Sequence, residues 1–86
     1  MQIKYSRDAI KFLDKQPKKT VERIREAISK LTIEPPEGDI ILLQGYSDGR
    51  KRLRIGTCRI IFNKIAEDEI DIIFIIDIGN RGDIYK

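Results

Sequence analysis

Residues 49–62 read GRKRLRIGTCRIIF, and this stretch decides the fold. In its first half Arg50, Arg52 and Arg54 alternate with Lys51, Leu53 and Ile55. This alternation matches the two-residue side-chain period of a β-strand. Gly56-Thr57 interrupts the pattern, and the β-branched and aromatic run Cys58–Phe62 follows. A glycine-led loop of two residues between such runs predicts a tight β-hairpin.

The short loop also fixes which residues face each other across the hairpin. It places Ile55 opposite Cys58, and Arg54 opposite Arg59. One side of the hairpin then carries Arg50, Arg52, Arg54 and Arg59, and the other carries Leu53, Ile55, Ile60 and Phe62. Directly opposed like charges destabilise a strand pair. The Arg54–Arg59 pair therefore indicates that an anion belongs on this side.

The remaining composition is that of a small, highly charged globular protein. A length of 86 residues fits one domain, expected to span residues 1–86, with a single modest core. The net charge is +3 and the pI is about 9.1, but residues 50–59 hold five basic residues and no carboxylate. A local basic surface on an otherwise balanced chain is typical of a phosphate-binding protein.

Several common chemistries are disfavoured by what the sequence contains. Cys58 is the only cysteine, so no disulfide can form within the chain, and histidine is absent. We therefore expect no metal and no cofactor. The longest apolar run, Ile72–Ile76, is too short to span a bilayer, and residues 1–20 lack a signal-peptide core. A cytoplasmic location is the resulting expectation.

The first half of the chain predicts one strand and two helices. Gln2–Tyr5 alternates like a strand, and Ser6 is a suitable N-cap for the helix that follows. Pro17 separates this helix from a second one, because proline is tolerated in a first turn but not inside a helix. Apolar residues recur at helical spacing from Val21 to Leu31, which indicates one buried face. The two helices are expected to form a hairpin.

The second half predicts mostly strands. Glu34–Asp39 is a loop by its prolines and glycine, and the form of the apolar segment Ile40–Leu43 stays open. After the arginine hairpin, Ile70–Asp77 is a central strand, and the pattern breaks at Gly79–Asp83. The order is β-α-α-β-β-β, an α+β fold with the helical hairpin on one face of a small, mainly antiparallel sheet. The helices should cover the apolar side and leave the arginine side open, as the floor of a site.

The sequence resembles the RelE/ParE superfamily of toxins from type II toxin–antitoxin pairs, over nearly the whole chain. The resemblance rests on Leu43-Gln44-Gly45, the hairpin Lys51–Phe62 and the ending Gly79–Tyr85. It implies a microbial-RNase-like RelE fold. For the RelE branch it implies a ribosome-dependent mRNA endoribonuclease without a metal. Such an enzyme uses the 2′-hydroxyl of the RNA as nucleophile and leaves a 2′,3′-cyclic phosphate and a 5′-hydroxyl.

The resemblance also implies roles for particular residues. The catalytic positions are Arg59, Arg81 and Tyr85, and the RNA-binding positions are Arg50, Lys51, Arg52 and Arg54. RelE-type enzymes often carry lysine where this chain has Arg52. Arginine loses a proton less readily than lysine, which shifts the general-base role toward Tyr85. Asp77 and Asp83 are interpreted as orienting partners for arginines. Cys58 is interpreted as structural, because it has no histidine partner.

Less specific interpretations stay open beside these. The arginines could form a solvated face, Arg81 could be a surface charge in a turn, and Tyr85 could only pack its ring on the sheet edge. At the level of function, the alternatives are a ParE-like inhibitor of DNA gyrase without enzymatic activity, and an inert remnant that only binds its antitoxin. The expected partners are a small acidic antitoxin, and the ribosome with its mRNA.

Overall fold

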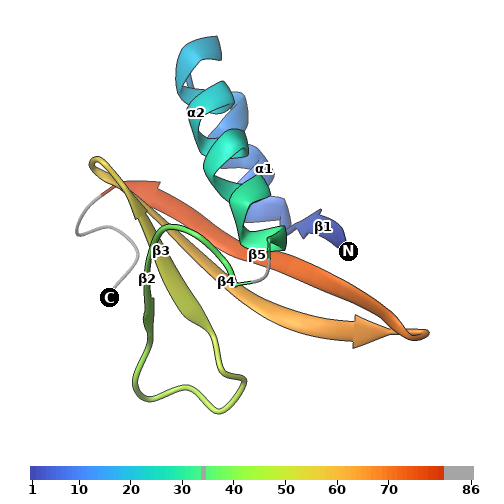
Figure 1. The fold of residues 1–86 in the computed structure, drawn as a ribbon. Coiled ribbons are helices and arrows are strands. Elements are labelled where there is room, and N and C mark those ends of the chain that lie inside the picture. Colours follow the sequence, from blue (N-terminus) through green and yellow to red (C-terminus); the bar gives the residue numbers. More distant parts are fainter. Residues whose placement is uncertain (34, 81–86) are drawn as a thin grey trace.

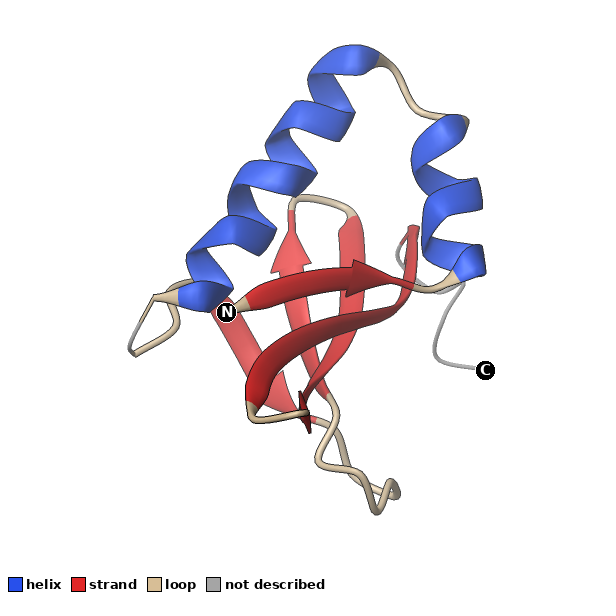
Figure 2. Cartoon of the chain, turned by 90° about the vertical axis from the view of Figure 1, so that its right-hand side faces the viewer, coloured by secondary structure: helices blue, strands red, loops and turns tan. Residues whose placement is uncertain are grey.

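A five-stranded sheet carries two helices on one of its faces, in the computed structural model, which describes residues 1–33 and 35–80 (Figures 1 and 2). The elements are β1 (Gln2–Tyr5), α1 (Arg7–Asp14), α2 (Lys18–Ser29) with the 3-10 turn η1 (Lys30–Thr32), β2 (Asp39–Leu42), β3 (Lys51–Ile55), β4 (Cys58–Glu67) and β5 (Ile70–Asn80). The sheet order is β1-β5-β4-β3-β2. Only β1 and β5 pair in parallel within the described sheet. The predicted α+β fold is confirmed.

Ser6 starts the helical layer, as the sequence predicts. Its hydroxyl accepts a hydrogen bond from the Ala9 backbone N–H at 3.0 Å, which satisfies a free donor of the first helical turn. The same hydroxyl donates to the Ile76 carbonyl at 2.7 Å. The register of β4 against β5 shifts between Ile61 and Phe62, which leaves Ile76 without a partner in the ladder. One side chain therefore caps α1 and ties it to the irregular point of β5.

The arginine hairpin forms with the predicted register. Ile55 pairs with Cys58, and Arg54 lies directly opposite Arg59. The apolar side of this hairpin meets the helices, since Leu53, Ile60 and Phe62 are buried in one cluster with Ile24, Ile28 and Leu31. The helical stripe is thus the cover of this face of the sheet, and the arginines lie on the other face.

Two strand boundaries differ from the expectation. Ile40–Leu43, whose form the sequence left open, is largely a strand, and β2 begins one residue earlier at Asp39, which was expected in the loop. The last strand does not stop at Asp77, because β5 continues through Gly79 and Asn80. These two residues pair with Arg59 and Cys58 on β4. Ladder pairing here outweighs the turn tendency of glycine and asparagine.

Gly38 controls how the chain enters β2. Its φ is +138°, a conformation that side-chain-bearing residues rarely adopt. A methyl group at this position would lie 2.6 Å from Leu53 Cδ1, and Leu53 is 1% exposed in the core. Because a buried leucine has little room to move, position 38 requires glycine for both reasons. The next residue, Asp39, is the first residue of β2.

We predict that Gly38→Ala lowers the free energy of unfolding more than Gly45→Ala does. Gly45 also has positive φ, +85°, but nothing lies within 4 Å of an added methyl group. The difference should be at least about 1 kcal/mol, the low end of overpacking costs. Urea denaturation of both variants measures it. Equal losses would show that Leu53 does not restrict position 38.

Candidate functional site

Two rows of paired residues cross the face of the sheet that the helices leave uncovered. The first row consists of Asp39 on β2, Arg54 on β3, Arg59 on β4 and Gly79 on β5. The second consists of Ile41, Arg52, Ile61 and Asp77 on the same strands. We call the side chains of Arg52, Arg54 and Arg59 the arginine face. It brings together three of the residues that the sequence singled out.

Asp39 bridges two of these arginines. Its Oδ1 accepts from Arg52 Nη2 at 3.1 Å, and its Oδ2 pairs with Arg54 Nε at 2.6 Å. The Arg52 side chain is only 12% exposed, while those of Asp39 and Arg54 are 41% and 51% exposed. The carboxylate thus fixes one buried and one accessible guanidinium relative to each other. This is an anion beside the opposed arginines, supplied by the chain itself.

Arg59 is held differently. Its residue exposure is 8%, and its Nη1 donates to the carbonyls of Gly56 and Cys58, each at 3.3 Å. Within residues 1–33 and 35–80 it forms no ion pair. A buried cation is costly unless hydrogen bonds or an opposite charge compensate it. The turn carbonyls hold Arg59 in place without neutralising its charge.

The expectation of an open arginine side needs correction. Only Arg54 is substantially exposed, because Asp39 on β2 lies against Arg52, and Arg59 folds back onto its own turn. Ile61 and Asn63 on the same face of β4 are also buried, at 5% and 9% exposure. Arg52 Nε and Asn63 Oδ1 are buried without a hydrogen-bond partner among the described residues. Such orphaned polar atoms are uncommon in folded proteins and call for an explanation.

Lys51 and Arg50, the other two predicted RNA-binding residues of this region, do not join the arginine face. Lys51 pairs with Phe62 and lines a hollow of about 190 Å³ on the helix side, together with Leu31 and Lys64. Arg50 precedes β3, where its Nη2 binds Asp48 Oδ2 at 2.8 Å and its guanidinium lies 4.2 Å from the Tyr46 ring centre.

Arg50 and Asp48 change each other's proton affinity. The side-chain hydrogen bond from Arg50 holds the pKa of the exposed Asp48 carboxyl below its usual value. The same bond raises the pKa of Arg50. Arg50 therefore already has an anionic partner and an aromatic one at the sheet's edge.

Three further predicted residues lie outside the described part of the chain: Arg81, Asp83 and Tyr85. Arg81 directly follows Asn80, the last residue of β5. Asp77 is described, and its Oδ1 accepts from the Ile78 backbone N–H at 2.9 Å. It forms no ion pair within residues 1–33 and 35–80. The carboxylate that orients the arginines of the arginine face is Asp39, which sequence reasoning missed.

One signal in the sequence could have identified Asp39. The run Asp39-Ile40-Ile41-Leu42 precedes the hairpin by a turn-like segment, Gly45–Gly49. Antiparallel pairing of this run with Lys51–Arg54 places an aspartate directly across from an arginine. Opposite charges at facing positions favour that register.

The described residues contain neither a candidate membrane span nor a group of metal ligands. No helix within residues 1–33 and 35–80 is long and apolar enough to cross a bilayer. The same residues hold no group of three or more Asp, Glu, Cys or His side chains placed to bind a metal ion.

The fold is shared with solved structures of RelE toxins in complex with their RelB antitoxins. The archaeal RelE–RelB complex from Pyrococcus horikoshii contains a chain that is 29% identical, with a TM-score of 0.73 over 95% of this chain and 96% of that one. The RelBE2 toxin–antitoxin complex from Mycobacterium tuberculosis matches at 20% identity and a TM-score of 0.70, covering 93% and 96%. The Escherichia coli RelBE complex matches at 21% and 0.58, covering 92% and 94%.

A family model shows which toxin family the chain belongs to. The model for the ParE toxin of type II toxin–antitoxin systems, parDE, matches residues 3–85. The chain therefore belongs to this toxin family. A search of curated proteins gave no match. The resemblance on which the sequence prediction rested, to the RelE/ParE superfamily, is confirmed.

We predict that Asp39→Asn destabilises the protein by about 1–2 kcal/mol, because it removes the charged partner of two arginines, one of them buried. Glu67→Gln is the matched control. Glu67 forms a 3.3 Å pair with Lys4 in which both side chains are more than half exposed. Such pairs contribute about 0.5 kcal/mol or less. Urea denaturation should separate the two variants, and equal stabilities would contradict the bridging role of Asp39.

Proposed function

We propose that this toxin is a ribosome-dependent mRNA endoribonuclease. The observation that carries the proposal is the arginine face, where Asp39 bridges Arg52 and Arg54, and Arg59 lies directly opposite Arg54 without an ion pair among the described residues. Guanidinium groups bind phosphate oxygens through paired hydrogen bonds and keep their charge at any physiological pH. An RNA backbone phosphate supplies an anionic partner for Arg59 and a second one for the half-exposed Arg54.

The proposed reaction breaks the phosphodiester bond by internal transfer. The 2′-hydroxyl of the RNA loses its proton as its oxygen attacks the adjacent phosphorus. The bond between this phosphorus and the 5′-oxygen then breaks. The 5′-oxygen takes up a proton. The products are a 2′,3′-cyclic phosphate and a 5′-hydroxyl, and no other reactant is consumed. Charge grows on the phosphoryl oxygens in the transition state, where preorganised cations lower the barrier most.

The residues divide between positioning and catalysis. Arg52 and Arg54 position the phosphate, because Asp39 fixes their guanidinium groups relative to each other. Arg59 stabilises the transition-state charge, and its hold on the turn carbonyls supports this role because a fixed cation needs no reorganisation during the reaction. By resemblance to the superfamily, the proposal adds Arg81 to the charge-stabilising set and gives Tyr85 the proton transfer.

A second candidate function is inhibition of DNA gyrase without enzymatic activity. The matching family model favours it, since that family is described by ParE rather than RelE. A shared fold does not decide between the two targets. The arginine face favours the nuclease, because an inhibitor of gyrase needs no preorganised phosphate site at the centre of its sheet.

Partners and location follow from the same proposal. RelB is the partner in the archaeal complex, whose toxin chain matches this one over nearly its full length. We propose that a cognate antitoxin likewise inhibits this chain, and that residues 1–86 act as one toxin domain. A toxin that acts on translating ribosomes works in the cytoplasm.

Cleavage of a message on programmed ribosomes tests the proposed function. The purified toxin should cut the mRNA within the codon in the decoding site and leave a 2′,3′-cyclic phosphate. A message with a single 2′-deoxy residue before that bond should stay intact, because the nucleophile is missing. Arg59→Gln should lower the single-turnover rate about 100-fold or more. Arg25→Gln, an exposed change on α2, should leave it unchanged.

Two controls keep this experiment decisive. Arg54→Gln should also slow cleavage, and its half-exposed side chain makes a folding defect a poor explanation of the loss. Gyrase supercoiling is assayed in parallel with the same toxin preparation. An intact message together with blocked supercoiling would overturn the nuclease and establish the inhibitor.

A further inference from the structure

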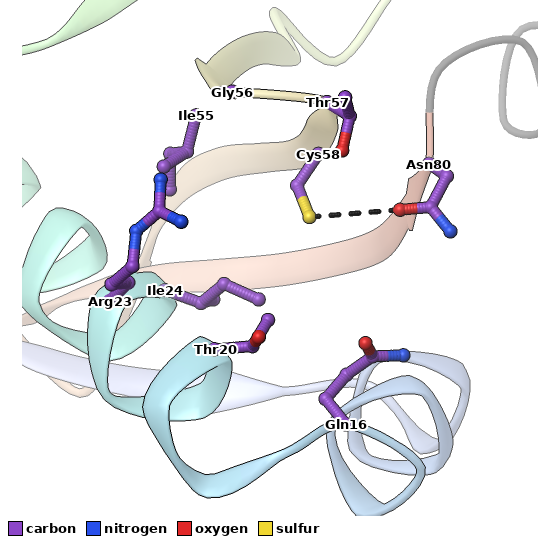
Figure 3. A pocket seen from close by; sticks show the side chains of 9 residues that line it. All are labelled: Gln16, Thr20, Arg23, Ile24, Ile55, Gly56, Thr57, Cys58 and Asn80. Carbon is purple, nitrogen blue, oxygen red and sulfur yellow. Dashed lines mark hydrogen bonds between the residues drawn. The ribbon is translucent and has the colours of Figure 1, made fainter.

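A second site lies on the helix side of the sheet, at the end of the arginine hairpin. A pocket of about 370 Å³ opens there between α2 and the β3–β4 turn (Figure 3). Small-molecule sites in proteins range from roughly 300 to 1,000 Å³. The pocket is lined by Gln16, Thr20, Arg23, Ile24, Ile55, Gly56, Thr57, Cys58 and Asn80. None of the three arginines of the arginine face lines it.

The lining has the chemistry of a site for an anion attached to a flat ring. It contains one cation, Arg23, and no carboxylate. The Arg23 guanidinium lies over the turn, since a methyl group at Gly56 would be 3.6 Å from its Nη2. Within residues 1–33 and 35–80 Arg23 forms no ion pair. Its charge is therefore available to a ligand phosphate.

The opposite end of the pocket carries hydrogen-bonding amides. Cys58 Sγ lies 3.8 Å from Asn80 Oδ1, and this contact directs the amide nitrogen of Asn80 away from the sulfur (Figure 3). Gln16, in the loop between α1 and α2, presents its amide to the pocket (Figure 3). Side-chain amides both donate and accept, which suits the edge of a nucleobase. The apolar side chains of Ile24 and Ile55 also line the pocket, and Ile55 lies beside the Arg23 guanidinium (Figure 3).

The pocket adjoins the arginine face through a shared element, the Gly56-Thr57 turn. Both turn residues line the pocket, while the Gly56 carbonyl accepts from Arg59 Nη1. Cys58, which lines the pocket, and Arg59, on the arginine face, are consecutive residues whose side chains point to opposite faces of β4. A single RNA strand that passes over this turn can occupy both the pocket and the arginine face.

We propose that this pocket binds one nucleotide of single-stranded RNA, next to the nucleotide whose phosphate occupies the arginine face. Arg23 holds its phosphate, the apolar floor of Ile24 and Ile55 contacts its base, and the amides of Gln16 and Asn80 reach the base edge. This inference rests on the proposed function and extends it, because it gives the RNA substrate a second point of contact. It also gives the enzyme a means of preferring particular bases beside the cleavage position.

Titration of the full chain with adenosine 5′-monophosphate tests the pocket by NMR. The mononucleotide should shift the backbone amide signals of Gly56, Thr57 and Cys58 and the side-chain amide of Asn80. Arg23→Gln should weaken this binding at least tenfold, and Arg25→Gln on the same helix should leave it unchanged. The spectra of both variants also report whether the fold is intact. Inorganic phosphate alone should bind more weakly, because it cannot use the floor or the amides.

The outcomes separate this inference from the proposed function. Absence of shifts around the pocket, or equal affinity for phosphate and mononucleotide, overturns the nucleotide site, even if the message is still cleaved. Binding at the pocket that Arg23→Gln does not weaken overturns it too. Retained pocket binding in a toxin that leaves messages intact overturns the nuclease, and with it the role of the pocket in positioning RNA.

Discussion

The register that places Arg54 directly opposite Arg59 is the constraint on which the rest of this structure depends. The same register turns Leu53, Ile60 and Phe62 toward the helices, so the core and the arginine face are two consequences of one pairing. A slip by one residue would turn the arginines into the core. The burial of three large apolar side chains therefore holds two like charges side by side. At roughly 1.5–3 kcal/mol per side chain, burial outweighs the repulsion of one cross-strand pair of like charges.

The repulsion is relieved by one carboxylate from another strand and by two carbonyls of the adjacent turn. Asp39 pairs with Arg54 and Arg52 from the edge strand, and the carbonyls of the hairpin's own turn accept from Arg59. Gly38 makes the first contact possible, because only a residue without a side chain fits above Leu53 where the chain turns into β2. The site is thus assembled by the same sheet that the core stabilises. Contacts within the fold fix its cations, as the proposed electrostatic catalysis requires.

The parts that the sequence predicted correctly are those determined by local spacing. The hairpin register followed from the two-residue turn at Gly56-Thr57, and the start of α1 from the N-cap at Ser6. The parts it missed are determined by partners far along the chain. Asp39 joins a strand only because β3 pairs with it, and Gly79 and Asn80 extend β5 only because β4 runs alongside. The burial of Arg59 was missed for a different reason. Side-chain hydrogen bonds to a turn leave no periodic signal.

The central claim is that the arginine face contacts RNA phosphates. The most direct test is the salt dependence of the affinity for a short single-stranded RNA. Each phosphate contact to a single strand contributes about 0.7 to the slope of log affinity against log salt. Arg52→Gln and Arg54→Gln should each lower the slope by about that amount. The exposed α2 change Arg25→Gln should leave it as in the parent protein. Parental slopes in both arginine-face variants would contradict the account.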